Sequence, residues 1–164
     1  MLRALAKVPG PLRLVIAGVP ENPAYLDELR NLAAALGISG RVEWLGGIDD
    51  ATMIRHYAQC RAVVFTPQDE DLGYITLEAM LSGKPVITTT DAGGPLEFIS
   101  QKREGLITTP TPEALSQAFM SLHEDVSLAE TMGRAGLERY QSLNISWEHV
   151  VETLTGEAAK PAPG

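Results

Sequence analysis

Two glutamates that could share one ligand, Glu70 and Glu78, are separated by seven residues in the stretch EDLGYITLEAM. A carboxylate accepts hydrogen bonds from hydroxyl groups, so the pair could hold a sugar or a ribose. Between them, Gly73 allows a close turn into a helix, and the free N–H groups of residues 72–76 would attract a phosphate. The two carboxylates would repel that phosphate unless hydroxyl donors occupied them. The stretch therefore points to a ligand that carries both phosphate and hydroxyls.

A simpler interpretation needs no ligand. Glu78 near a helix N-terminus is stabilised by the helix dipole, and residues 69–71 could form a solvated acidic loop. The spacing alone favours this interpretation. A second segment, TTTDAGGPLEFI, changes the balance because it again leaves a strand, passes Gly93 and Gly94, and enters a short helix that holds Glu97. Two such loops in consecutive units favour a phosphate-bearing ligand at one edge of a sheet.

Short apolar runs rich in β-branched residues alternate with helical patterns along most of the chain. Such runs are typical of parallel strands that are covered on both faces. We therefore predict an α/β fold, a Rossmann-like, doubly wound parallel sheet with helices on both faces. The first helix between strands is expected to have Asn22 as its cap and to end at Gly37. The predicted strands are residues 12–18, 42–46, 62–67, 85–90 and 105–109.

One domain, residues 1–155, is predicted, followed by a disordered Pro-rich tail at 156–164. Residues 2–10 resemble the end of a helix, whereas a doubly wound domain normally begins with a strand that lies in the middle of the sheet. The first strand is therefore expected to be missing. Further helices are predicted after Asp50, at residues 73–82 and from Thr111-Pro112 onward. Another is predicted to begin at residues 127–130, which have the capping-box spacing, and to end near Tyr140. The last predicted helix contains Trp147, Val150, Val151 and Leu154.

Composition and charge limit the classes of partner. The formal net charge of −8 argues against nucleic acid or an anionic membrane as a partner. No apolar run approaches the ~20 residues of a transmembrane segment, so a cytoplasmic protein is expected, with peripheral membrane association of a longer protein left open. The one cysteine, Cys60, excludes an internal disulfide and is expected to pack. No cluster of metal ligands is visible, and no cofactor is expected.

The segment from Glu70 to Ile99 resembles the donor-binding core of retaining glycosyltransferases with the GT-B fold. The family pattern there is E-x7-E, with Ala-Met or similar after the second Glu, then Gly-Lys-Pro-Val and a Gly-Gly turn followed closely by Glu. The resemblance extends over about residues 1–155 and includes the adjoining segments 41–67 and 104–119. The matching residues are, in order, Glu70, Glu78-Ala79-Met80, Gly83-Lys84-Pro85-Val86, Gly93-Gly94 and Glu97.

The resemblance implies the donor-binding domain of a hexosyltransferase, which transfers a sugar from a nucleotide-diphospho-sugar to an acceptor without a metal. Glu70 would hold hydroxyls of the donor sugar close to the reaction centre, as the catalytic residue. Glu78 would accept hydrogen bonds from the ribose. The other residues that the resemblance places at the donor are Gly18, the backbone near Trp44, Leu45 and Gly46, the amides of Leu72, Gly73, Tyr74 and Ile75, and Gly93, Gly94 and Glu97.

The chain also departs from the family pattern. The basic residues that neutralise the diphosphate and the N-terminal acceptor-binding domain are expected to be missing, so the chain alone is expected to be inactive. The family's Gly-Phe-Gly is Asp71-Leu72-Gly73 here, and its usual Pro is Ile75, which leaves the donor open. Lys84 follows the helix end and is expected to cap that helix rather than bind phosphate. An epimerase-like nucleotide-sugar domain and a non-catalytic flavodoxin-like binding module are the alternatives.

Overall fold

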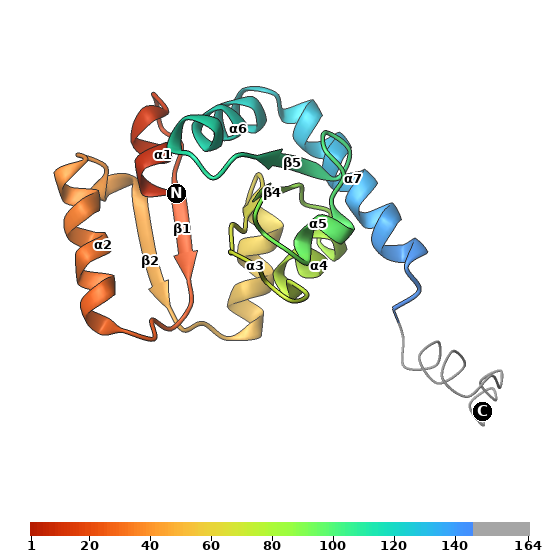
Figure 1. Ribbon diagram of the computed structural model, residues 1–164, viewed down its shortest axis with the longest axis horizontal. Helices are drawn as coiled ribbons and strands as arrows, with labels where there is room; N and C mark the ends of the chain where they lie inside the picture. Colours follow the sequence, from red (N-terminus) through yellow and green to blue (C-terminus); the bar gives the residue numbers. More distant parts are fainter. Residues whose placement is uncertain (146–164) are drawn as a thin grey trace.

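The computed structural model describes residues 1–145, which form an α/β domain with parallel strands (Figure 1). Each strand lies within one of the five predicted runs, so the predicted fold class is confirmed. The predicted last helix and the predicted tail lie outside the described residues. The strands are β1 (Leu14–Ala17), paired with β2 (Val42–Gly46), and β3 (Val63–Val64), paired with β4 (Val86–Thr89), which also pairs with β5 (Gly105–Thr108).

In residues 1–145 the strands form two separate groups, one of two strands and one of three. The sequence predicted one doubly wound sheet and did not indicate this division. Figure 1 shows β1 and β2 apart from β4 and β5. No ladder joins β1 to β3, and a groove of about 860 Å³ lies between them. In a doubly wound sheet of strand order 3-2-1-4-5-6, the place between these two strands is that of the first strand. β3 has two residues and a strand partner on one side only.

The helices begin close to the predicted positions, with one exception. α2 and α6 have the predicted caps Asn22 and Thr111. The predicted start of α7 at Ser127 is wrong, because Asp125 Oδ1 accepts a hydrogen bond from Leu128 N at 2.8 Å and begins the helix earlier. No helix in this part of the chain is long and apolar enough to cross a membrane. The helices are α1 (Leu2–Lys7), α2 (Pro23–Ala35), the 3-10 helix η1 (Ser39–Arg41), α3 (Asp50–Gln59), α4 (Tyr74–Leu81), α5 (Pro95–Phe98), α6 (Pro112–Glu124) and α7 (Val126–Ser142).

Two hydrophobic clusters hold the helices against the strands. The larger cluster includes Leu5 and Leu122, where α1 packs against α6. The smaller cluster lies around α4 and contains Leu77, Met80 and Val86. Because α4 is packed against both β4 and α7, its N-terminus is held at the carboxyl ends of the strands. The core therefore fixes the helix that carries Glu78.

Candidate functional site

The candidate site lies between β1 and β3, where the winding of the sheet reverses. β1 leads outward to β2, whereas β3 leads outward to β4 and β5. In doubly wound sheets, ligands bind outside the carboxyl ends of the strands at such a point. The residues that line the groove toward this end include Ala17, Leu45, Ile75 and Glu78. The second glutamate of the opening stretch therefore borders the groove.

Glu70 lies in the loop after β3, which is joined to the loop after β4 by three backbone hydrogen bonds. Asp69 N donates to Asp91 O at 3.0 Å, and Glu70 N donates to Ala92 O at 3.0 Å. In return, Gly94 N donates to Glu70 O at 2.6 Å. The prediction that the two glycine-rich loops meet at one edge of the sheet is thereby confirmed. The Glu70 side chain is exposed to solvent.

The glycines of these loops allow the two backbones to approach closely. A Cβ on Gly93 would lie 2.6 Å from Glu70 O, and one on Gly94 would lie 2.5 Å from Asp71 O. A Cβ on Gly73 would meet the proline ring of the second loop at 2.8 Å. Contacts this short would force the backbones apart. The positions of these glycines in the sequence suggested a ligand site. The spacing could not show their packing role, because each contact joins two different loops.

The first turn of α4 has free amide groups. Gly73 precedes the helix with φ 75° and ψ 59°, a left-handed conformation that glycine adopts without strain. In the described part of the chain, the N–H groups of Leu72, Gly73, Tyr74 and Ile75 donate no hydrogen bond. Thr76 N donates to Gly73 O at 2.8 Å, so the run of free amides is one residue shorter than predicted. These amides and the helix dipole could bind an anion.

The loop after β4 has fewer free donors. The amides of Gly94, Leu96 and Glu97 all donate to backbone carbonyls, and Pro95 has no N–H. α5 is a single turn. The exposed side chain of Glu97 remains free to contact a ligand at this edge. This loop therefore shapes the site mainly by its position against the Glu70 loop.

Glu78 is held by a tyrosine that the sequence analysis did not single out. Tyr57, near the end of α3, donates its hydroxyl to Glu78 Oε2 at 2.7 Å, and both residues line the groove. Burial, and then the hydrogen bond to Glu78, raise the pKa of Tyr57, so its hydroxyl stays protonated as a donor. No sequence spacing connects the two residues, because they lie on different helices 21 positions apart.

Gly18 and Gly46 lie side by side at the carboxyl ends of β1 and β2. Gly18 N donates to Gly46 O at 2.8 Å, which extends the strand pairing by one residue. Their φ angles are 138° and 67°, and no atom lies within 4 Å of the place where a Cβ would stand on either residue. The space around both glycines is therefore open toward solvent. Trp44 packs against the larger cluster, whereas Leu45 lines the groove.

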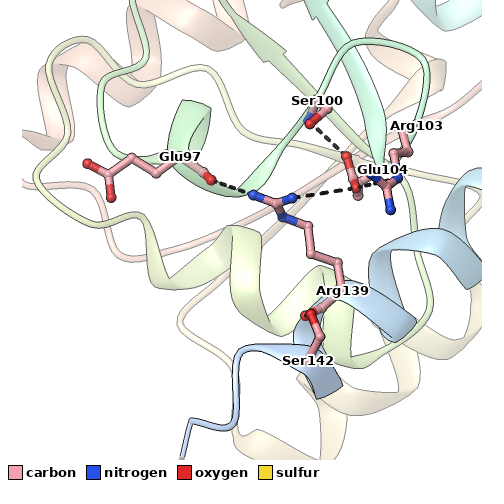
Figure 2. Close-up of polar contacts among 6 residues, drawn as sticks. All are labelled: Glu97, Ser100, Arg103, Glu104, Arg139 and Ser142. Carbon is pink, nitrogen blue, oxygen red and sulfur yellow. Dashed lines mark hydrogen bonds and ion pairs between the residues drawn. The ribbon is translucent and has the colours of Figure 1, made fainter. Parts of the chain in front are cut away.

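A polar network between α5 and α7 holds the backbone of Glu97 in place (Figure 2). Arg139 on α7 donates from Nη2 to Glu97 O at 2.9 Å. The fully buried Glu104 accepts a hydrogen bond from Ser100 N at 2.8 Å. Its Oε1 lies 3.2 Å from Arg103 Nε and 4.0 Å from Arg139 Nη1. The network ties the end of α5 to α7, and it could not be found from sequence because its members lack a recognisable spacing.

Lys84 and Cys60 have structural contacts. Lys84 Nζ donates to Ala58 O at 2.9 Å, so it caps the end of α3, whereas the sequence analysis expected it to cap its own helix. Burial raises the pKa of the Cys60 thiol, which contacts Tyr57 O at 3.3 Å. No group of three or more His, Cys, Asp or Glu side chains in residues 1–145 could hold a metal ion.

Sequence comparisons identify relatives among enzymes that transfer sugars. The family described as "Glycosyl transferases group 1" matches residues 1–139. The mouse (Mus musculus) protein "Alpha-1,3/1,6-mannosyltransferase ALG2" is 35% identical over 74% of this chain and 29% of its own length. The "D-inositol 3-phosphate glycosyltransferase" of Corynebacterium glutamicum (strain R) is 28% identical over 88% of this chain and 34% of its own length. The chain thus spans about a third of these relatives.

Solved structures share the fold. "Anabaena Alr3699/HepE in complex with UDP and glucose" superposes with a TM-score of 0.80 at 28% identity, covering 95% of this chain and 44% of that chain. The "C-terminal Domain of Glycosyl Transferase Group 1 Family Protein (LpcC)" from Francisella tularensis superposes with a TM-score of 0.69 at 18% identity. The match covers 88% of this chain and 92% of that chain. The second likeness concerns the fold alone. Together with the family match over most of its length, these comparisons show that the chain belongs to the group 1 glycosyl transferases.

Proposed function

We propose that the chain is the donor-binding domain of a retaining glycosyltransferase, which transfers a sugar from a nucleotide-diphospho-sugar to an acceptor. The observation that carries this proposal is the free first turn of α4, which lies between Glu70 and Glu78 at the reversal point of the sheet. The fold neighbour HepE, 28% identical, is described in complexes with UDP, with UDP and glucose, and with UDP-glucose. The comparisons do not favour the epimerase-like or flavodoxin-like alternatives.

Each part of such a donor has a suitable partner at the site. The amides of residues 72–75 would bind the diphosphate, since they have no other acceptor in the described part of the chain. Glu78, at the groove, would accept hydrogen bonds from the ribose, and Glu70, on the loop beyond, would accept them from the sugar. The carboxylates of Glu70 and Glu78 would then meet hydroxyl groups, and the amides would meet the anion.

The residues present fit a transfer without a metal. A retaining transfer of this type needs no dedicated protein nucleophile if the leaving diphosphate is stabilised as its charge develops. The free amides and the dipole of α4 would supply part of that stabilisation if the diphosphate binds at these amides as proposed. Glu70 would orient the sugar and stabilise the positive charge that forms at the carbon of the broken bond.

We further propose that the complete protein has a parallel strand between β1 and β3, and an N-terminal domain that binds the acceptor. The support for the strand is the groove itself, which is bordered by Leu14, Ile16, Val64 and Phe65 and lies between two strand edges without a ladder. A strand placed there would complete both ladders. The support for the second domain is the length of the relatives, of which this chain covers 29–34% in the two described above.

Titration of the isotope-labelled chain with UDP and with UDP-glucose, followed by NMR, tests this function. We expect saturable, weak binding that moves the amides of residues 72–75 first and those of the Gly93-Gly94 loop next. We also expect no acceptor-dependent release of UDP by the chain alone. Shifts confined to α6 and α7, or no shifts at millimolar nucleotide, would contradict the assigned site.

A further inference from the structure

Glu78 has two carboxylate oxygens with different surroundings. Oε2 accepts the hydroxyl of Tyr57 at 2.7 Å. Oε1 accepts no hydrogen bond from any residue in 1–145. An ionised carboxylate has about four acceptor positions, so the contact with Tyr57 leaves most of them available to a ligand. The contact nevertheless fixes which way the carboxylate is turned.

Tyr57 is itself held in place by packing. Its ring lies against the smaller hydrophobic cluster around α4, the same cluster that contains Leu77 and Met80 on either side of Glu78. Lys84, just after α4, donates to Ala58 O, so the end of α3 is tied to α4 next to this tyrosine. A hydroxyl on a packed ring is a more rigid donor than a solvent molecule. The orientation of the Glu78 side chain is therefore set before a ligand arrives.

We propose that Tyr57 is a positioning residue for nucleotide recognition, because it turns Glu78 so that Oε1 can accept a ribose hydroxyl. This inference rests on the proposed function, which assigns the ribose to Glu78. It adds a specificity: the site should prefer ribonucleotides over 2′-deoxyribonucleotides, and that preference should depend on Tyr57. Without the tyrosine, the carboxylate can turn to other positions, and the hydrogen bond to the ribose loses its fixed geometry.

The experiment compares UDP with 2′-deoxy-UDP, and GDP with 2′-deoxy-GDP, as ligands of the chain by NMR titration. The wild-type chain should bind the ribose form of at least one pair about tenfold more tightly, as expected for one hydrogen bond to a charged group. In Tyr57→Phe the preference should fall to about twofold, while the affinity for the deoxy form stays unchanged. Tyr140→Phe is the matched control, because Tyr140 packs against the same cluster and its hydroxyl has no hydrogen bond in residues 1–145. It should keep the wild-type preference.

The outcomes separate the two levels of the proposal. If neither wild-type nucleotide pair binds, the proposed donor site is wrong and the role of Tyr57 is wrong with it. If the wild type binds both forms equally, Glu78 does not bind the ribose 2′-hydroxyl, and the inference about Tyr57 is overturned. If the wild type discriminates and Tyr57→Phe discriminates equally well, the proposed function stands and the positioning role is overturned. If Tyr57→Phe weakens both forms equally, Tyr57 supports the fold only, which also overturns the inference.

Discussion

Gly94 donates its backbone N–H to the carbonyl oxygen of Glu70 at 2.6 Å, and this contact joins the two loops that border the candidate site. Glu70 is therefore positioned by the loop after the next strand as well as by its own loop. A movement of one loop alone would break the three backbone hydrogen bonds that join the two loops. The role proposed for Glu70 thus depends also on the loop after β4, which holds Glu70 in position.

Gly94→Ala should separate the loops. The added Cβ would lie 2.5 Å from Asp71 O, and overpacking of this kind costs about 1–3 kcal/mol. We expect both a lower free energy of unfolding, measured in urea, and weaker UDP binding. Gly40→Ala is the control, because a Cβ there meets nothing within 4 Å, and it should change stability by less than about 0.5 kcal/mol. Equal effects of the two substitutions would contradict the packing role of Gly94.

The divided sheet should be visible in hydrogen exchange. β4 is paired on both sides, whereas β1 and β3 are each paired on one side only. Amides of β4 should therefore exchange more slowly than those of β1 and β3, since exchange follows local opening. In a longer protein with a strand between β1 and β3, protection of these two strands should rise toward that of β4. Uniform protection of all the strands in this chain would count against an open place in the sheet.

The sequence predicted the parts of this domain that local signals control. The β-branched runs gave the positions of the strands, and Asn22 and Thr111 capped helices as predicted. Contacts between distant segments were not predictable in the same way. The bond from Tyr57 to Glu78 joins residues 21 apart on different helices, and the bond from Arg139 to Glu97 joins residues 42 apart. Such pairs follow from how helices pack, and a single sequence carries no periodic signal for that.

Arg139→Met should destabilise the end of α5. Arg139 donates to Glu97 O and is one of the two cations near the buried Glu104, so its loss leaves that carboxylate with Arg103 alone. Because Arg139 is partly exposed, we expect a loss of about 1–2 kcal/mol in unfolding free energy rather than the full effect of breaking a buried pair. Arg134→Met removes an exposed arginine from the same helix and should be nearly neutral, because the side chain of Arg134 makes one hydrogen bond within residues 1–145, to the Thr131 hydroxyl. A loss as large for Arg134 would refute the role of the network.

The start of α3 should respond to acid. Hydrogen bonds from Thr52, first of its side chain and then of its backbone N–H, hold the pKa of Asp49 below the usual 3.8. A lowered pKa means that the cap stabilises the fold above pH 3.8 and that this contribution is lost as the pH falls through the folded-state value. Asp49→Asn keeps a capping side chain that does not titrate, so urea midpoints should depend less on pH in this window. Asp50→Asn removes a neighbouring charge but leaves the Asp49 cap in place. An equally large change in the pH dependence of the urea midpoint in this variant would contradict the role assigned to the cap.

Glu70 and Glu78 should have different kinetic roles in a longer enzyme of the proposed kind that contains this domain. Glu78 is assigned to the ribose, which changes little as the transition state forms, so Glu78→Gln should mainly raise the donor KM. Glu70 is assigned to the sugar beside the carbon that develops positive charge, so Glu70→Gln should lower kcat by about 10²-fold. If the two residues are only an acidic helix start, both variants should have nearly wild-type kinetics and a stability change of a few tenths of a kcal/mol. Steady-state kinetics with varied donor distinguish these cases, and a wild-type kcat in Glu70→Gln would remove Glu70 from the reaction centre.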